Sequence, residues 1–392
     1  MGGNMDNVDD VIDAYSRLAR ASIDAQLKSD DTSFSNSIGL KLTKNRLLVW
    51  VNEPSELIIN NDLKNKLEQI LSSILYPAFV VKHKPGLTLV PRLDQPPESA
   101  RALSFDLHYG IYQRLQVNSL ADTNVFTNGN KLAIRLMSDY YWLPANGGQS
   151  HVSIMSSTRG GKTTLIRYLA VNCVTYAKVA VQNGAMDDGA NSLVVIDPKL
   201  DADLRLTTLK LDGIYICPDF SKSDNSFVDK VCQQLKTVID LVQQRALKRK
   251  ADPSIKFKDI FVFLDEGISI PNMANTNKNI YFRLLDRLLL MGASFQVHII
   301  MASQSFLAGT NGAVTSQGRL EFGLKILMAS RINTENAQFL FKSLDKDAIN
   351  NLILDEDNYG TLGVGIITNG SDGNGNDDNI VPFKAPFVGG LE

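Results

Sequence analysis

SSTRGGKTTLI (residues 156–166) lies between the apolar run HVSIM and a helical pattern of apolar residues. A phosphate-binding loop has the spacing Gly, four residues, then Gly-Lys-Ser/Thr, between a strand and a helix. Gly161, Lys162 and Thr163 match this spacing, whereas Ser156 stands in the place of the first glycine. A serine is tolerated there if its backbone φ stays negative. The stretch therefore predicts a phosphate-binding loop, the alternative being an ordinary strand–turn–helix.

The chemistry of such a loop assigns roles to its residues. A helix N-terminus presents free backbone N–H groups and the positive end of the helix dipole, which together bind phosphate. Lys162 would reach the β- and γ-phosphates of ATP, Thr163 would bind Mg²⁺ through its hydroxyl, and Arg159 would touch the γ-phosphate or an adjacent subunit. The predicted phosphate cradle consists of Ser156, Ser157, Thr158, Arg159, Gly160, Gly161, Lys162, Thr163 and Thr164. We therefore expect ATP and Mg²⁺ as cofactors.

A second candidate segment is the apolar run DIFVFLDEG (259–267), which carries two adjacent carboxylates near its end. Asp265, at the carboxyl end of the expected strand, would hold the Mg²⁺. Glu266 would orient and deprotonate the attacking water, which is the role of a general base in ATP hydrolysis. An acidic pair at an exposed strand end is the alternative explanation, but its combination with the loop favours a catalytic role.

A third segment, VHIIMASQS (297–305), is expected to form a buried strand that delivers Gln304 to the same edge of the sheet. Ligands bind outside the carboxyl ends of parallel strands, so the amide of Gln304 would sense the γ-phosphate or position water. The alternative is a strand-end polar residue with ordinary hydrogen bonds. His298, inside the same strand, is expected to be a buried structural histidine.

The pattern of apolar residues changes near residue 116. Residues 1–115 show a helical stripe followed by mixed strand and helix patterns, without a catalytic constellation. From 116 to 392, apolar β-runs alternate with amphipathic helices, which is typical of a parallel sheet covered on both faces. The expected fold is therefore α/β, with a mostly parallel sheet and helices on both faces in residues 116–392 and an N-terminal α+β appendage in residues 1–115.

The composition is that of an ordinary globular protein, with 44% hydrophobic and 21% charged residues in a chain of 392. A formal net charge of −2 gives no global signal for nucleic acid, so binding would need a local patch or an internal channel. Cys173, Cys217 and Cys232 are widely spaced and indicate core thiols in a reducing compartment. Without a signal-peptide pattern or an apolar run of about 20 residues, we expect a cytoplasmic protein that is peripheral at the inner face of the membrane only through partners.

Together these segments resemble the FtsK/SpoIIIE/HerA-type DNA translocases. VVIDPKLDADL (194–204) is similar to the Ile-Asp-Pro-Lys segment of that family, and LLLMGASFQVHIIMASQS (288–305) to its helix, glycine and sensor strand. ILMASRINTENAQFL (326–340) resembles the strand and Ser-Arg-Ile-Asp segment that follow. The resemblance covers about residues 140–345 and is closest to the FtsK-like coupling proteins of Gram-positive conjugative elements.

This resemblance implies a RecA-like P-loop ATPase core, usually a hexameric ring with ATP sites at subunit interfaces. It also implies binding of DNA without sequence specificity, with a relaxase or secretion-channel protein as partner. A trans-acting arginine belongs to the family pattern; Arg331 and Arg319 are the candidates here, with Lys325 weaker. The sequence departs from the family at Ser156 and at Ala293, which stands in the place of an arginine.

Two parts of the chain would contact DNA in this interpretation. The first is a basic cluster formed by Arg245, Lys248, Arg249, Lys250, Lys256 and Lys258. Phosphates favour such a cluster, although basic residues at a helix C-terminus are also typical of a solvated cap. The second is the loop 306–318, which would line the pore of a ring as flexible backbone.

Two other functions fit the same motifs. A type VII protein-secretion ATPase shares this core and needs no basic surface. An assembly scaffold that binds ATP without productive turnover is suggested by Ser156 in place of the loop glycine. Stimulation of ATP hydrolysis by DNA distinguishes the translocase from both alternatives.

Overall fold

The computed structural model describes residues 7–27, 38–52, 58–84, 86–157, 160–274, 276–309, 312–328, 337, 339–341, 360, 362–368 and 379–389. The chain divides into two compact units. The first comprises Met1–Ile111, Ser343–Asp355 and Asn379–Pro382. The second comprises Tyr112–Lys342, Glu356–Asp378 and Phe383–Glu392.

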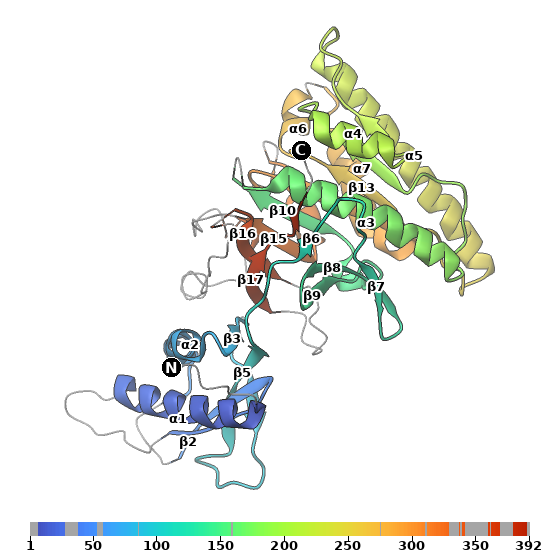
Figure 1. The fold of residues 1–392 in the computed structure, drawn as a ribbon. Coiled ribbons are helices and arrows are strands. Elements are labelled where there is room, and N and C mark those ends of the chain that lie inside the picture. Colours follow the sequence, from blue (N-terminus) through green and yellow to red (C-terminus); the bar gives the residue numbers. More distant parts are fainter. Residues whose placement is uncertain are drawn as a thin grey trace. The chain divides into compact units, whose positions relative to one another are not determined.

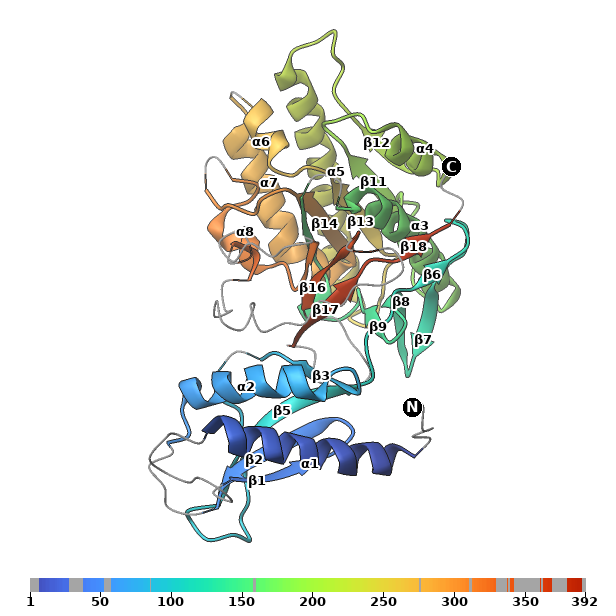
Figure 2. The same cartoon turned by 60° about the vertical axis from the view of Figure 1, so that its left-hand side comes forward.

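Within its described residues, the first unit forms a five-stranded antiparallel sheet with two helices against it (Figure 2). Its elements are α1 (Val8–Leu27), β1 (Ile38–Leu42), β2 (Arg46–Val51), α2 (Asn61–Leu75), β3 (Phe79–Lys82), β4 (Leu89–Pro91) and β5 (Arg101–Tyr109). The strand order is β1-β2-β5-β3, and β4 also pairs with β5. Leu47, Val49 and Val51 alternate along β2 and point into the core, as expected for a sheet with one buried face. Helix α1 buries Ala19 and Ile23, four residues apart, against this core.

The second unit begins with short strands and continues with a regular alternation of strands and helices (Figure 1). The short elements are β6 (Gln116–Val117), β7 (Val125–Asn128), β8 (Lys131–Met137), β9 (Tyr140–Trp142) and the 3-10 helix η1 (Gly147–Gln149). The alternating part is β10 (Val152–Ser156), α3 (Lys162–Gln182), β11 (Leu193–Ile196), α4 (Ala202–Lys210), β12 (Ile214–Ile216), α5 (Asp224–Ala251), β13 (Ile260–Leu264), α6 (Ser269–Met273), α7 (Lys278–Met291), η2 (Gly292–Phe295) and β14 (Val297–Ser303). The remaining elements are α8 (Ser316–Leu320), β15 (Leu324–Met328), β16 (Val364–Thr368), β17 (Ile380–Lys384) and β18 (Phe387–Val388). The boundary between the two units falls within β17, after Pro382.

The central sheet has eight strands in the part of the chain that the structure describes, in the order β12-β11-β13-β14-β10-β15-β16-β17. The strands from β12 to β15 are parallel to their neighbours, whereas β16 is antiparallel to β15. The α/β class expected from the alternating pattern is therefore confirmed. The sheet, expected to be mostly parallel, is mixed, because β16 runs antiparallel to β15. Its central strands β10, β11, β13 and β14 are buried along their whole length, which explains their continuous apolar sequences.

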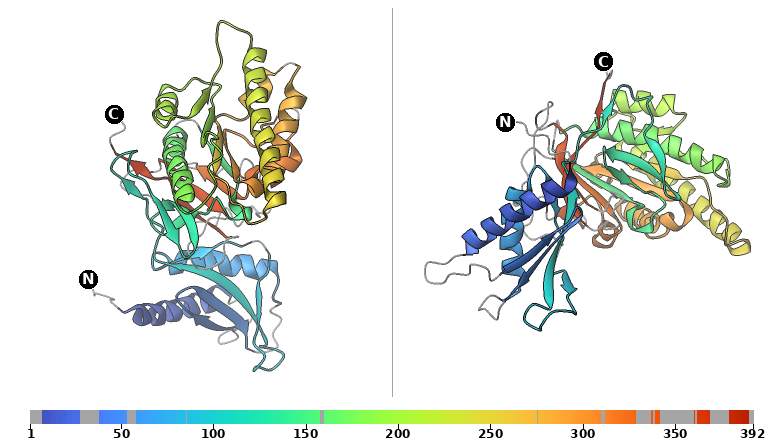
Figure 3. Two further views of the ribbon diagram at one scale, coloured as in Figure 1. Left: turned by 90° about the vertical axis from the view of Figure 1, so that its right-hand side faces the viewer. Right: turned by 60° about the horizontal axis from the view of Figure 1, so that its bottom comes forward.

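Helices cover this sheet on both faces. α3 and α4 lie on one face, and α5 and α7 lie on the other, as Figures 2 and 3 show. The sides follow from the strand order: the chain moves outward from β10 to β11 and β12, and then back to β13 and β14. Because parallel crossovers are right-handed, a reversal of direction moves the connecting helix to the opposite face. The reversal leaves β14 between β10 and β13.

The three cysteines are free, and only Cys173 is fully buried. Burial raises the pKa of the Cys173 thiol well above its usual value, and it raises the pKa of Cys232 to about 11. These thiols are therefore protonated and unreactive at neutral pH.

Among the described helices, none is both long enough and apolar enough to cross a membrane.

Candidate nucleotide-binding site

The loop between β10 and α3 has the geometry of a phosphate cradle. Strand β10 ends at Ser156, and α3 begins at Lys162 after Gly161, whose φ of 88° lies in the left-handed region that favours glycine. The backbone N–H of Gly160 donates to the carbonyl of Ser157 at 3.1 Å, which tightens the turn. Thr158 and Arg159 lie outside the described residues. The start of α3 therefore opens directly onto the loop, as a bound phosphate requires.

Ser156 fits the position of the missing first glycine. It is the last residue of β10 and lies in extended backbone, so its side chain causes no conformational strain. Its Oγ donates to the carbonyl of Ser157 at 3.0 Å. A Cβ built on Gly160 would lie 2.4 Å from this Oγ, so the serine hydroxyl occupies space that a residue larger than glycine at 160 would need.

The three predicted segments meet in one place. Lys162 Nζ lies 2.8 Å from Asp265 Oδ1 and 3.1 Å from Glu266 Oε2. Asp265 and Glu266 directly follow β13, and Gln304 directly follows β14, the strand between β13 and β10. The backbone N–H of Gln304 donates to Glu266 Oε1 at 3.2 Å, and its Nε2 lies 3.5 Å from Glu266 Oε2. The sheet order thus brings together side chains that are about 100 and 40 residues apart in the sequence.

The turn after β13 holds Glu266 in an unusual backbone conformation. Its φ is 48°, which is rare for a residue other than glycine. The neighbouring Gly267 donates its N–H to the carbonyl of Ala302 at 2.8 Å, and a Cβ on Gly267 would lie 2.8 Å from the side chain of Met301. The neighbouring strand β14 therefore fixes the turn that directs Glu266.

Lys199 joins this cluster, although no role was predicted for it. It follows β11 in the Ile-Asp-Pro-Lys segment, and its Nζ lies 2.6 Å from Glu266 Oε2. Its position in the sequence could have indicated this role, because a lysine shortly after an apolar parallel strand lies at the same edge of the sheet as the other site residues. Asp201, two residues further on, lines the same cleft and caps α4 by accepting from the N–H of Leu204 at 2.8 Å.

Burial and the neighbouring opposite charges act against each other on the pKa values of this cluster. Burial raises the pKa of Asp265, and the nearby ammonium of Lys162 only partly opposes this. Burial would also raise the pKa of Glu266, but hydrogen bonding from Lys199 and the charge of Lys162 together lower it. Burial would lower the pKa of Lys162, but the two carboxylates outweigh it and raise that pKa. The lysine is therefore charged at neutral pH, as a phosphate ligand must be.

The cluster lines a cleft of about 370 Å³. Its lining residues are Ser156, Ser157, Gly161, Lys162, Thr163, Thr164, Lys199, Asp201, Asp265, Glu266 and Gln304. Thr163 and Asp265 therefore share the cleft, and a hydroxyl with a carboxylate is an oxygen donor set that suits Mg²⁺. No group of three or more His, Cys, Asp or Glu side chains in the described residues can hold a metal. A Mg²⁺ ion here would need phosphate oxygens and water as its other ligands.

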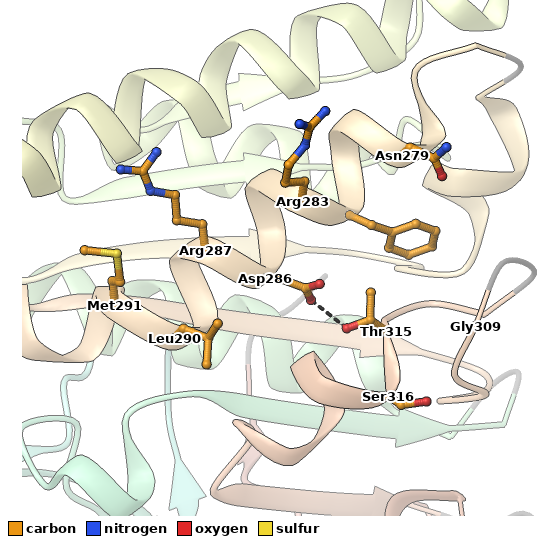
Figure 4. A pocket seen from close by; sticks show the side chains of 10 residues that line it. Asn279, Arg283, Asp286, Arg287, Leu290, Met291, Gly309, Thr315 and Ser316 are labelled. Carbon is orange, nitrogen blue, oxygen red and sulfur yellow. Dashed lines mark hydrogen bonds between the residues drawn. The ribbon is translucent and has the colours of Figure 1, made fainter.

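A larger cavity of about 600 Å³ lies elsewhere, along α7 (Figure 4). Arg283 and Arg287 project from α7 beside it, and Asp286 accepts a hydrogen bond from the hydroxyl of Thr315 at 2.7 Å. Phe282, Leu290 and Met291 give it a mostly apolar lining. It has neither a glycine turn at a long helix nor a pair of carboxylates, so its chemistry does not suit a triphosphate.

Of the two candidate arginines, Arg319 lies in the described part of the chain, and it does not line the cleft. Arg331 lies outside the described residues. Arg319 is buried within its own chain, where its Nη1 lies 3.4 Å from the carbonyl of Phe306, and burial lowers its pKa. Burial, and then the charge of Arg319, lowers the pKa of Lys325. A group that acts on a neighbouring subunit must be exposed, and Arg319 is not.

The basic cluster predicted for DNA is largely used inside the protein. Arg245 is 1% exposed; its guanidinium donates to both carboxylate oxygens of Asp188, at 2.7 and 3.2 Å, and to the carbonyls of Phe295 and Lys258. Both expectations, a DNA contact and a solvated cap, are therefore wrong for Arg245. The reason is that Arg245 of α5 lies against three segments, namely the loop before β11 with Asp188, the end of η2 and the residue before β13, and their buried carboxylate and carbonyls need donors.

Two further members of the cluster also have internal partners. Arg249 donates to Gln296 Oε1 at 3.0 Å and to the carbonyls of Ile255 and Ser294, and it lies over the ring of Phe295. Lys258 pairs with Asp187 at 2.5 Å. Lys248, Lys250 and Lys256 are exposed. Three separate lysines form a weaker phosphate-binding surface than the six charges expected from the sequence.

His298 is a buried structural residue, as expected from its place in β14. One ring nitrogen lies 2.8 Å from Asp259 Oδ1 and the other 3.0 Å from the carbonyl of Ser150, and the ring stacks on Phe261.

The loop 306–318 is packed rather than free in its described residues, because Phe306, Ala313 and Val314 are buried.

The fold and the site define an α/β protein with a candidate phosphate-binding loop facing two carboxylates. No protein-family model matches the sequence, and no curated protein matches it.

Several solved structures are similar to the chain, among them a conjugation coupling protein and type VII secretion ATPases. The pCW3 conjugation coupling protein TcpA with ATPγS is 13% identical, with a TM-score of 0.43 over 95% of this chain and 94% of that one. EssC (ATPases 2 and 3) from Geobacillus thermodenitrificans is 16% identical, with a TM-score of 0.44 over 71% and 48% of the two chains. The cytoplasmic domain of the type VII secretion ATPase EccC of Thermomonospora curvata is 16% identical, with a TM-score of 0.40 over 63% and 26%. At these values, similarity does not decide the function.

Proposed function

We propose that this chain is an ATP-hydrolysing motor with a RecA-like P-loop core. The observation that supports it is the convergence of Lys162, the Asp265–Glu266 pair and Gln304 on one cleft at the start of α3. A phosphate loop alone binds many phosphorylated ligands. A loop that faces a metal-binding carboxylate, a second carboxylate and an amide has the parts needed to cleave a phosphoanhydride.

In this mechanism the backbone N–H groups at the start of α3 and the ammonium of Lys162 bind the phosphates. Thr163 and Asp265 would hold Mg²⁺, which supplies positive charge to the β- and γ-phosphate oxygens. Glu266 accepts a proton from the attacking water, which lies on the γ-phosphate side of the cleft. Gln304, whose backbone N–H already holds Glu266 Oε1, orients the carboxylate and reports on the γ-phosphate.

We propose DNA as the cargo, moved without sequence specificity by a homo-hexamer in conjugative transfer. The resemblance of the segments 194–204 and 288–305 to FtsK-like coupling proteins supports this cargo. The trans-acting arginine would be Arg331, because Arg319 is buried in its own chain. A relaxase or secretion-channel protein would then deliver the DNA. In this proposal residues 1–115 form a separate appendage and residues 116–392 the motor domain.

One observation favours protein secretion as the second candidate. Arg245, Arg249 and Lys258 are bound to groups of their own chain, so the expected basic surface is reduced to separate lysines. A motor that moves polypeptide needs no such surface. The test is ATP hydrolysis with and without single- and double-stranded DNA: several-fold stimulation supports the DNA motor, and measurable turnover that DNA leaves unchanged supports secretion.

Two variants test the ATPase itself. Lys162→Ala removes the charge that binds the phosphates and is expected to abolish ATP binding. Glu266→Gln retains the shape of the side chain but cannot accept a proton, so ATP should still bind while hydrolysis is lost. Normal turnover in Glu266→Gln would refute the base assignment. ATP binding without any turnover in the wild-type protein would support the scaffold alternative.

A further inference from the structure

Lys199 belongs to the segment after β11 for which the proposed mechanism has no use. Its Nζ lies 2.6 Å from Glu266 Oε2, and its side chain is 48% exposed and lines the cleft. A lysine side chain with four methylene groups and this much solvent access can move by several ångströms without disturbing the core. Lys199 can therefore leave the candidate base Glu266 and pair with another anion that lies within its reach.

The backbone that carries Lys199 is fixed. Asp197 is fully buried, and its Oδ1 accepts from the N–H of Lys199 at 2.8 Å. Its Oδ2 accepts from the N–H of Asp201 at 2.7 Å and from the hydroxyl of Tyr215 at 2.6 Å. Leu200, with a φ of 57°, completes a tight turn between these anchors. The segment is thus a rigid support from which one mobile cation extends into the cleft.

Both carboxylate oxygens of Glu266 accept hydrogen bonds in this arrangement. Oε1 accepts from the backbone of Gln304 at 3.2 Å, and Oε2 lies 3.1 Å from the ammonium of Lys162 and 2.6 Å from that of Lys199. Each carboxylate oxygen has two lone pairs, so the two ammonium groups engage both lone pairs of Oε2. When phosphates bind, Lys162 has a new partner, but Lys199 still contacts Oε2. Oε2 becomes fully available to accept a proton only when Lys199 also leaves.

We propose that Lys199 is a latch that holds Glu266 while the cleft is empty and transfers its ammonium to the γ-phosphate when ATP binds. This proposal rests on the proposed ATPase function. The γ-phosphate is the anion nearest to where Glu266 must act, and it offers more charge than the carboxylate that it replaces. ADP lacks that phosphate, so with ADP the lysine stays on Glu266. The latch therefore makes the base available only in the presence of the bond that it must cleave.

The test compares the binding of two nucleotides by titration calorimetry, without turnover. In Lys199→Ala we expect affinity for ATPγS to fall about tenfold, because a charge-assisted contact is lost and the lost pair with Glu266 offsets part of it. Affinity for ADP should change less than about twofold. Lys199→Arg should keep most of the preference for ATPγS. Lys210→Ala, an exposed lysine at the end of α4, is the matched control and should change neither value.

The outcomes separate the latch from the function on which it rests. An equal loss of ATPγS and ADP affinity, or no loss of either, in a Lys199→Ala protein with unchanged circular dichroism overturns the latch. If Lys199→Ala proves unstable, Lys199→Gln gives the same comparison. If the wild-type protein binds neither nucleotide, the ATPase proposal fails and the latch fails with it. If the wild type binds ATPγS but Lys199→Ala has the same ratio of the two affinities, only the latch fails.

Discussion

Replacing Arg245 with alanine should destabilise the second unit severely without affecting the nucleotide cleft. The guanidinium lies on α5, is 1% exposed, and donates to both oxygens of Asp188, whose side chain is 3% exposed. It also donates to the carbonyls of Phe295 at 2.6 Å and Lys258 at 2.8 Å, and it lies over the ring of Phe257. Truncation leaves the Asp188 carboxylate without its cation and both carbonyls without this donor.

The magnitude follows from the loss of one partner of a buried ion pair, which typically costs about 3–5 kcal/mol. The two carbonyls add to the loss rather than reduce it, so we expect about 4–5 kcal/mol. That is a large share of the roughly 5–15 kcal/mol by which domains are stable. With a urea m-value of about 2 kcal/mol per molar, the unfolding midpoint should fall by about 2 M.

Trp142 allows the second unit to be followed separately. The protein has two tryptophans, Trp50 in the first unit and Trp142 in the second. Trp142 is fully buried against Phe261, so its fluorescence should change strongly on unfolding. In a Trp50→Phe background, urea titration monitored by fluorescence therefore reports the second unit alone, which avoids a two-state assumption for the whole chain.

A loss below about 1 kcal/mol in Arg245→Ala would refute the structural role of this arginine. Lys250→Ala is the matched control, because this exposed residue of the same helix should change stability by less than about 0.5 kcal/mol. The double variant Arg245→Met with Asp188→Leu removes both charges, and it should recover most of the lost stability if the unpaired carboxylate is the cause.

Three further predictions address the loop, the metal and pH. Gly161→Ala places a side chain at a φ of 88° and should lower the stability of the second unit by about 1–2 kcal/mol and weaken ATPγS binding; unchanged values would show that the loop relaxes freely. Removal of Mg²⁺ with EDTA should stop hydrolysis, and Asp265→Asn should raise the Mg²⁺ needed for half-maximal rate at least about tenfold; an unaltered Mg²⁺ requirement would exclude Asp265 as a ligand. Burial, and then the nearby His298, lowers the pKa of His151 to about 3, so the folded protein keeps this ring neutral while the unfolded chain binds a proton below about pH 6.5. Its contribution to stability is present above that pH and is lost as the pH falls, by about 2 kcal/mol between pH 7.5 and 5. His151→Gln, which retains an acceptor for the N–H of Ile299, should flatten this part of the pH profile, and an identical profile would contradict the assignment.

The sequence predicted those features that depend on local pattern and on the rules of parallel sheets. The apolar runs became β10 to β15, and the loop between β10 and α3 formed where the Gly-Lys-Thr spacing indicated. Asp265 and Gln304 could be placed at one edge of the sheet because the carboxyl ends of parallel strands meet there. The antiparallel strand β16 was missed, since an apolar run carries no information about its direction.

Contacts between side chains that are far apart in the chain could not be predicted from the sequence. Lys199 and Glu266 are 67 positions apart, and Arg245 and Asp188 are 57 apart. Whether an arginine at the end of a helix faces water or a buried carboxylate depends on which loop passes it. The pattern of charges along α5 is the same in both cases. The sequence therefore left open a DNA-binding surface or a solvated cap, whereas both guanidinium groups of the cluster have internal partners.

The charge balance of the cleft links binding of the nucleotide to release of the base. Among the described residues that line it, Lys162 and Lys199 face Asp265 and Glu266, so the contacts of the empty cluster pair positive and negative groups closely. A bound triphosphate carries more negative charge than one Mg²⁺ neutralises, and in a partly buried cleft this excess is costly. In the described part of the lining, these two ammonium groups are the cations, and each one that turns to the phosphates leaves a carboxylate. In the proposed mechanism, binding of ATP would therefore free Asp265 for the metal and Glu266 for water through the same displacement, whereas a nucleotide without the γ-phosphate would attract fewer of these cations.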